Sequence, residues 1–282
     1  MAPSDPSMPP LMLIHPVGVG LSSRFWDRFI QYWHEEEPET ALLAPDLIGC
    51  GEAEFRSDPL TPEDWAQPLV DVLKNHDSGP AVLVAQGTTL PIALSVVEKA
   101  PELVCGLVAI SPPGWRVLNE TFPIEKSRQL WRWLFQGPIG NLFYRYARRR
   151  NFLRKFSRKN LFAQANAVDE EWLQALNEGS RDMNSRWAVY SFLAGFWRRD
   201  WAPQFTNLTI PMQMIFGESA AGIGSSRRWD DLNQRLATYS QNLPTALIQT
   251  IPGKNVLPYE SPKDCVNCVR NWLSSQTFNH LA

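Results

Sequence analysis

Apolar and partly β-branched residues gather in six short runs, each bounded by Gly, Pro or Asp, which is typical of strands buried on both faces. These runs cover residues 11–15, 41–45, 81–85, 103–110, 212–216 and 245–251. Helical patterns alternate with them at residues 25–33, 62–74, 90–100, 227–239 and 262–273. Because helical crossovers join parallel strands, the alternation predicts an α/β fold with a mostly parallel central sheet and helices on both faces.

The alternation of strands and helices stops after Ser111 and resumes at Pro211. The residues between them show helical periodicity, many Trp and Arg, and no convincing strand. An insertion at the carboxyl end of a parallel strand is where a lid over an active site lies. We therefore predict one core domain of residues 1–111 and 210–282, with a helical cap of residues 112–209 inserted in it.

The charges almost balance, with 27 basic and 29 acidic side chains and a formal net charge of −2. This balance gives no overall attraction to nucleic acid, and we expect no nucleic-acid partner and no cofactor. The first residues lack the basic and apolar pattern of a signal peptide, and no run approaches the ~20 apolar residues of a membrane span. We expect a cytoplasmic protein that meets a membrane at most peripherally.

Two loop motifs, in order and with consistent spacing, point to a known family. Leu-Ile-His-Pro-Val-Gly at residues 13–18 and Pro-Asp-Leu-Ile-Gly-Cys-Gly at residues 45–51 resemble the His-Gly-x-Gly loop and the Asp-x-x-Gly-x-Gly turn of the α/β-hydrolase superfamily. The similarity is to its cap-bearing esterase, lyase and dehalogenase-like branch. Family members usually begin with an antiparallel hairpin, but only ten residues precede Leu11, and Pro stands at 3, 6, 9 and 10. Since proline removes ladder donors, we predict that this hairpin is missing.

The resemblance also locates the Ser, Asp and His of the hydrolytic triad, which follow one another in that order. The strand-to-helix turn Gly-x-Ser-x-Gly aligns with residues 85–89, so Gly87 stands at the nucleophile. By the same comparison Ala220 takes the place of the acid and Asn255 that of the histidine. An alignment shifted by one would make Thr88 the nucleophile, but it would put larger side chains at the crowded positions of the turn.

The family's oxyanion hole uses two backbone N–H groups, which the resemblance assigns to Val17 and Thr88. His15 in the first loop and Gln86 beside the turn are further candidates for ligand contact. No histidine stands where a triad base is expected, because His15 belongs to the oxyanion loop and the others fall at helix ends or in the tail: His34, His76 and His280. We predict no metal site.

The predicted cap carries two further features. Several tryptophans lie in or beside it, which suits a large aromatic pocket for a bulky apolar ligand. A basic stretch interleaved with aromatic residues is the second feature. It suits an anionic membrane surface or an acidic protein partner, although a solvated helix with its apolar face on the domain is the commoner arrangement. The basic residues are Arg145, Arg148, Arg149, Arg150, Arg154, Lys155, Arg158 and Lys159.

The pair Cys265 and Cys268 forms a Cys-x-x-Cys motif, which occurs in redox and zinc sites. Here it lies in an amphipathic helical pattern, where this spacing places both residues on one face, and no second pair accompanies it. We expect it to serve packing.

Two hypotheses for function follow. The first is a pseudoenzyme that lacks the Ser-Asp-His triad and binds a bulky apolar ligand or a protein partner without turnover. The alternative is an atypical hydrolase or lyase acting on an ester-like or hydrophobic substrate through Glu218, Glu260, Thr88 or a bound water. Both expect Gly87, Ala220 and Asn255 to converge at the carboxyl ends of the strands.

Overall fold

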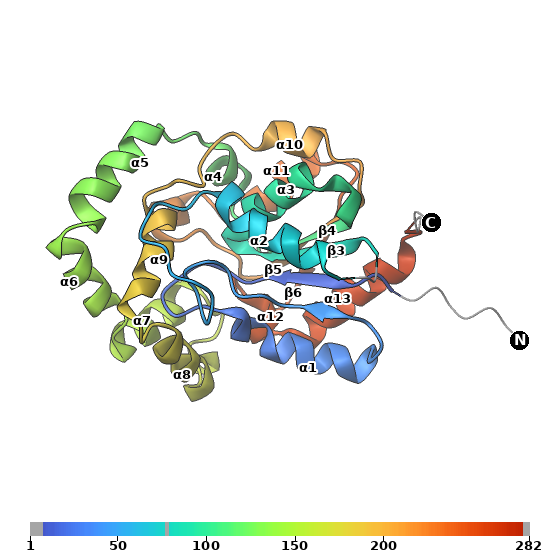
Figure 1. The fold of residues 1–282 in the computed structure, drawn as a ribbon. Coiled ribbons are helices and arrows are strands. Elements are labelled where there is room, and N and C mark those ends of the chain that lie inside the picture. The colour runs from blue at the N-terminus through green and yellow to red at the C-terminus, as the bar shows by residue number, and fades with distance from the viewer. Residues whose placement is uncertain (1–7, 77–78, 279–282) are drawn as a thin grey trace, which may run out of the picture.

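The computed structural model describes residues 8–76 and 79–278, and within them six strands form one parallel sheet (Figure 1). The strands are β1 (Leu11–Ile14), β2 (Leu42–Leu43), β3 (Ala81–Gln86), β4 (Val104–Ile110), β5 (Met212–Gly217) and β6 (Leu247–Ile251), in the order β2-β1-β3-β4-β5-β6. All pairs are parallel. The predicted parallel sheet is confirmed, although its second strand is only two residues long.

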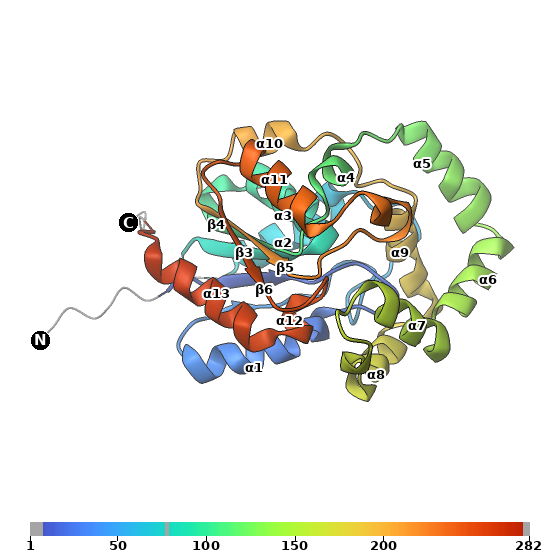
Figure 2. The same cartoon turned by 180° about the vertical axis from the view of Figure 1, so that it is seen from behind.

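Alternation along each strand divides the core into two layers. In β1, Leu11 and Leu13 pack on the side of α1 (Asp27–Glu36) and α13 (Pro262–Ser275). Met12 and Ile14 face the side of α2 (Pro62–Lys74) and α3 (Leu90–Lys99). Successive side chains of a strand point to opposite faces, so a strand covered on both sides has to be apolar throughout. Figures 1 and 2 show these helices on the two faces of the sheet.

The helix before β6 begins later than its sequence pattern predicts. The pattern covers residues 227–239, whereas α11 runs over Leu232–Asn242, and residues 224–228 form a separate 3-10 turn. The reason is an N-cap, since the Asp231 carboxylate accepts a hydrogen bond from the Gln234 N–H at 2.9 Å. A capping carboxylate satisfies a backbone donor that the first helical turn leaves free.

The expectation of a missing hairpin concerns the residues before β1. Residues 8–10 form no strand. Residues 1–7 lie outside the described part of the chain, so the rest of this expectation is untested there.

Residues 112–209 are helical in the structure and lie largely beyond the carboxyl ends of the strands (Figures 1 and 2). Their helices are α4 (Trp115–Asn119), α5 (Ile124–Leu130), a π-helical turn η4 (Trp131–Phe135), α6 (Pro138–Ala147), α7 (Arg150–Asn160), α8 (Glu170–Gly179), α9 (Arg186–Leu193) and α10 (Ala202–Thr206). A small core of its own, which includes Trp131, Tyr144 and Tyr190, holds η4, α6 and α9 together. None of the described helices is long and apolar enough to cross a membrane.

A buried ion pair fixes the loop that follows β4. The guanidinium of Arg235 contacts both carboxylate oxygens of Asp230, at 2.7 and 2.9 Å, and also donates to the Pro112 carbonyl at 3.1 Å. Tyr239, one turn further along α11, donates its hydroxyl to the Pro113 carbonyl at 2.8 Å. The interaction is bidentate and shielded from water, so removing either partner would leave the other charge buried alone.

Replacing Arg235 with Met should lower the free energy of unfolding by about 3–5 kcal/mol, because Asp230 would stay buried without its counter-charge. The matched control is Arg270→Met, which breaks a pair with Glu36 whose side chains are 29% and 44% exposed. That change should cost less than about 1 kcal/mol. Urea unfolding followed by circular dichroism measures both, and equal losses for the two variants would contradict the role given to the buried pair.

Candidate active site

A sharp turn joins β3 to α3 at the carboxyl edge of the sheet. Gly87 has φ of +65° there, a conformation that side-chain-bearing residues rarely adopt and that the nucleophile turn of α/β hydrolases requires. A Cβ placed on Gly87 would meet only the Ser111 carbonyl oxygen within 4 Å, at 3.9 Å. The turn therefore has room for a side chain, and crowding is not what restricts this position to glycine.

Ser111 lies beside this turn and was not foreseen as a site residue. Gln86 pairs with Ile110 in the sheet, so Gly87 and Ser111 follow neighbouring strand ends. Ser111 has φ of +48°, the one positive value of a non-glycine residue in the described ranges, and strain of this kind clusters at functional sites. Its buried hydroxyl has no hydrogen-bond partner there, and neither does the Gln86 Oε1. Its place directly after a predicted buried strand is the feature of the sequence that could have marked Ser111 as a site residue.

Asn255 joins four segments at this edge. Its side-chain amide donates to the Asn160 carbonyl at 2.8 Å and to the Ala221 carbonyl at 2.9 Å. Its backbone N–H donates to the Leu161 carbonyl at 2.9 Å, while its own carbonyl accepts from Gln86 Nε2 at 2.8 Å. The loop after β6 is thereby fastened to the end of α7, to the loop after β5 and to the turn that contains Gly87.

Ala220 is buried in the loop after β5, next to the residue that Asn255 contacts, and its N–H donates to the Gly217 carbonyl at 2.8 Å. The hydrogen bonds of Gln86, Asn255 and Ala221 bring the three loops together at the carboxyl edge. That Gly87, Ala220 and Asn255 replace a catalytic triad remains a prediction of the motif comparison.

His15 holds the first loop in place. Its Nδ1 donates to the Pro16 carbonyl at 3.0 Å, and its Nε2 accepts from the Leu47 N–H at 3.0 Å, which together define the neutral tautomer. The ring is completely buried, and this burial lowers the pKa of the imidazole below its ordinary value of 6.5. With both nitrogens occupied by the backbone, His15 positions the loop, whereas the sequence suggested a ligand contact.

The two backbone groups assigned to the oxyanion hole belong to neighbouring strands. Val17 follows β1 and Thr88 follows β3, and these strands pair at Ile14 and Ala85. Thr88 lies in the first turn of the short helix Gly87–Thr89, where N–H groups lack partners within the helix. Their assignment to one oxyanion hole stays a prediction.

The remaining histidines and acids are placed differently. His34 is at the end of α1 and His76 follows α2; both helices lead into strands, so these residues lie near the amino-terminal edge, away from Gly87. His280 is outside the described residues. Glu260 uses both carboxylate oxygens, accepting from the Ala163 N–H at 2.6 Å and the Lys254 N–H at 2.8 Å, and Glu218 is exposed.

Cys265 and Cys268 lie side by side on α13 among the buried residues of the sheet face. Burial raises the pKa of both thiols, that of Cys268 to about 11, so that they stay protonated and unreactive at neutral pH. Across residues 8–76 and 79–278 no group of three His, Cys, Asp or Glu side chains is placed to hold a metal ion. Packing accounts for this motif.

Most of the tryptophans near the cap contribute to packing. Trp172 meets Phe162 edge to face and lies tilted against Tyr259, and Trp115 contacts Phe205 and Tyr239. Trp131, Trp197 and Trp201 are also buried, whereas Trp133 projects into solvent. A large aromatic pocket built from these tryptophans stays a prediction.

The arrangement described so far, a parallel sheet with a nucleophile-type turn and loops converging at its carboxyl edge, defines the α/β-hydrolase class. The model of the alpha/beta hydrolase family matches residues 11–267, so the chain belongs to that family, as the loop motifs predicted. No curated protein matches the sequence significantly.

Solved structures of the class share the fold. A thermophilic esterase from Thermogutta terrifontis has a TM-score of 0.69 and 18% identity, covering 94% of this chain and 89% of its own. A serine hydrolase involved in carbazole degradation has a TM-score of 0.70 and 17% identity, covering 95% and 92%. A Nostoc protein described as an α/β hydrolase has a TM-score of 0.71 and 18% identity, covering 95% and 91%. At these identities the likeness establishes the fold.

His15 should make stability depend on pH. The folded chain keeps this ring neutral, while the unfolded chain takes up a proton as the pH falls below the ordinary pKa of 6.5. The free energy of unfolding should therefore decrease on acidification, by up to about 1.4 kcal/mol per pH unit from this one group. His15→Gln should flatten the profile between about pH 6.5 and 5, and the control His34→Gln, at an exposed histidine, should not. Urea unfolding at a series of pH values decides it, and identical profiles for wild type and His15→Gln would argue against the assignment.

Proposed function

We propose that this α/β-hydrolase-fold protein binds an apolar molecule with a carbonyl or carboxylate oxygen at the turn of Gly87, without hydrolysing it. The ligand oxygen would accept hydrogen bonds from the N–H groups of Val17 and Thr88, as in an oxyanion hole. Glycine at the nucleophile position supplies no attacking atom, and the amide of Asn255 has no proton to exchange near neutral pH.

One observation carries this proposal: no atom crowds the position that a Cβ on Gly87 would take. A residue that had lost its role to crowding would be surrounded by neighbouring atoms, but only the Ser111 carbonyl comes near the added Cβ, at 3.9 Å. Two buried polar atoms close to the turn, Ser111 Oγ and Gln86 Oε1, also lack partners in the part of the chain that the structure describes. Buried polar atoms ordinarily find one, so a bound molecule or water is expected beside them.

A second candidate is hydrolysis through a non-standard set of residues, and the comparisons by themselves favour it. The matching family is one of hydrolases, and the similar structures include an esterase and a serine hydrolase. Against it stand the hydrogen bonds of Glu260, whose two carboxylate oxygens both serve the backbone. Thr88 is the one hydroxyl among the residues named for this alternative. Of the histidines in the described part of the chain, His15 has both ring nitrogens bonded to the backbone, and His34 and His76 lie at the other edge of the sheet, so Thr88 has no histidine to act as its base.

The binding site can be tested with two substitutions at one position. Gly87→Ala and Gly87→Leu both place a side chain at positive φ, so both should lose about 1–3 kcal/mol of stability. Leu alone would fill the ligand space. Titration calorimetry with decanoate should therefore show binding to wild type and Gly87→Ala, and at least about a tenfold loss for Gly87→Leu, since occlusion removes the buried contact. Equal affinity of Ala and Leu variants, or no binding to the wild type, would count against a ligand site above Gly87.

Turnover separates the two candidates. The wild type should not cleave p-nitrophenyl decanoate or react with a fluorophosphonate probe, and the single changes Gly87→Ser, Ala220→Asp and Asn255→His should remain silent, because a triad acts as a unit. The triple variant should gain weak esterase activity through the oxyanion donors, which contribute about 3 kcal/mol in hydrolases. It should also lose about 1–3 kcal/mol of stability with the amide bonds to Asn160 and Ala221. Wild-type turnover abolished by Thr88→Ala would establish the second candidate instead.

A further inference from the structure

The helix α6 carries two neighbouring apolar stripes, and only one of them is covered. Gly140, Tyr144 and Ala147 are buried against the rest of the molecule. The other stripe carries Ile139, Leu142, Phe143 and Tyr146, which are 60%, 70%, 40% and 52% exposed. Positions i, i+3, i+4 and i+7 form one stripe along a helix. A surface helix normally has one apolar stripe, which faces the core, so the second stripe of α6 is an apolar surface that the described chain leaves uncovered.

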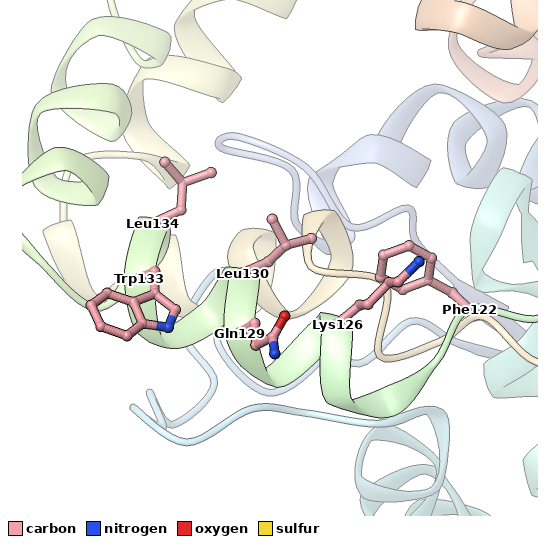
Figure 3. Close-up of a pocket in the computed structure, with 6 residues that line it drawn as sticks. All are labelled: Phe122, Lys126, Gln129, Leu130, Trp133 and Leu134. Carbon is pink, nitrogen blue, oxygen red and sulfur yellow. The ribbon is translucent and has the colours of Figure 1, made fainter.

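The bare apolar surface continues on both sides of α6. Before it, Trp133 is 77% exposed at the end of a groove of about 390 Å³ (Figure 3), which is lined by Phe122, Lys126, Gln129, Leu130, Trp133 and Leu134. After it, the rings of Tyr146, Phe152 and Phe156 follow one another with centroids 5.1 and 6.1 Å apart. Exposed apolar residues scattered singly are normal, whereas a contiguous patch of this kind marks an interaction surface.

The same segment is strongly basic, with eleven of the 27 Lys and Arg side chains of the chain. Residues 126–168 contain eleven Lys and Arg side chains and no Asp or Glu, although the whole chain has a net charge of −2. Arg150 and Arg154 pair with Glu170, and Arg148 donates to the carbonyls of Ser180 and Arg181. The rest form no ion pair within the described chain: Lys126, Arg128, Arg132, Arg145, Arg149, Lys155, Arg158 and Lys159.

The placement of the segment leaves it accessible. Figures 1 and 2 show α5 and α6 at the margin of the molecule, on the side opposite to the chain termini, with α7 next to α6. The apolar side chains of this segment are exposed, with arginines beside them in sequence at 132, 145 and 149. Apolar side chains flanked by free cations suit the boundary between acyl chains and anionic headgroups, where both kinds of group are satisfied.

We propose that the cap arm, defined as η4, α6 and α7 (residues 131–160), docks on an anionic lipid bilayer. Trp133, Leu142 and their apolar neighbours enter the acyl boundary, while the unpaired arginines and lysines contact lipid phosphates. Binding is peripheral and depends on salt, because the attraction acts over about a Debye length. This inference rests on the surface alone and is independent of what occupies the site at Gly87.

Flotation of the full chain with lipid vesicles tests the proposal. The protein should bind vesicles of phosphatidylcholine with phosphatidylglycerol, bind phosphatidylcholine alone far more weakly, and be released by added salt. The double change Arg145→Gln with Arg149→Gln should lower the partition coefficient about thirtyfold. The matched control Lys74→Gln with Lys263→Gln, at exposed cations elsewhere on the chain, should leave it unchanged.

The apolar contribution is tested separately. Trp133→Ser with Leu142→Ser should lower the partition coefficient about tenfold or more, whereas Ile223→Ser with Leu247→Ser, at exposed apolar positions elsewhere, should not. Unchanged melting temperatures show that the variants are folded. Brominated lipids should quench part of the wild-type fluorescence, and this part should disappear in Trp133→Phe.

Three results would overturn the proposal. One is equal binding to neutral and anionic vesicles. Another is vesicle binding that the arm variants leave intact. The third is an absence of vesicle binding. Capture by polyglutamate would then assign the arm to an acidic protein partner, and self-association that Trp133→Ser with Leu142→Ser abolishes would assign it to a second copy of the chain.

Discussion

The carboxyl edge of this sheet depends on the side-chain amide of Asn255. Its two N–H groups reach carbonyls on either side, one at the end of α7 and one in the loop after β5. An amide nitrogen offers two donors in fixed directions, whereas a neutral imidazole offers a single N–H. Asn255, which the motif comparison aligns with the catalytic histidine, thus clamps the end of α7 to the loop after β5. A group that takes part in two structural bonds is not free to shuttle protons.

A buried ion pair holds another loop at the same edge, the one after β4. The buried pair of Asp230 and Arg235 reaches the carbonyl of Pro112, directly after Ser111. His15 performs the corresponding task for the first loop, using both ring nitrogens on backbone groups. Each of these loops is therefore held by buried or partly buried side chains that hydrogen-bond to its backbone. Ser111 Oγ and Gln86 Oε1 are exceptions, because these two buried atoms have no hydrogen-bond partner in the described residues.

The sequence predicted the fold well and the site only in part, for reasons that particular residues make clear. Strands such as β3 could be predicted because both faces are buried, which makes residues 81–85 apolar without interruption. The start of α11 was misplaced because one capping carboxylate, Asp231, outweighed the helical pattern before it. His15 and Glu260 were taken as chemical candidates, since a sequence records which groups titrate and not which backbone atoms they meet. Ser111 was missed because strain in φ leaves no trace in residue type.

The absence of a side chain at Gly87 affects how closely a ligand could approach the backbone of the turn. In an enzyme of this class the nucleophile's side chain stands between the ligand and the strand end, and keeps the two about a side chain apart. If Gly87 stands at the nucleophile position, as we propose, hydrogen replaces that side chain, and a bound molecule would contact the peptide groups of residues 87 and 88 directly. The ligand would then gain van der Waals contact with the backbone, whereas it would meet no nucleophile. Under this proposal the backbone of the turn would select ligands by their shape.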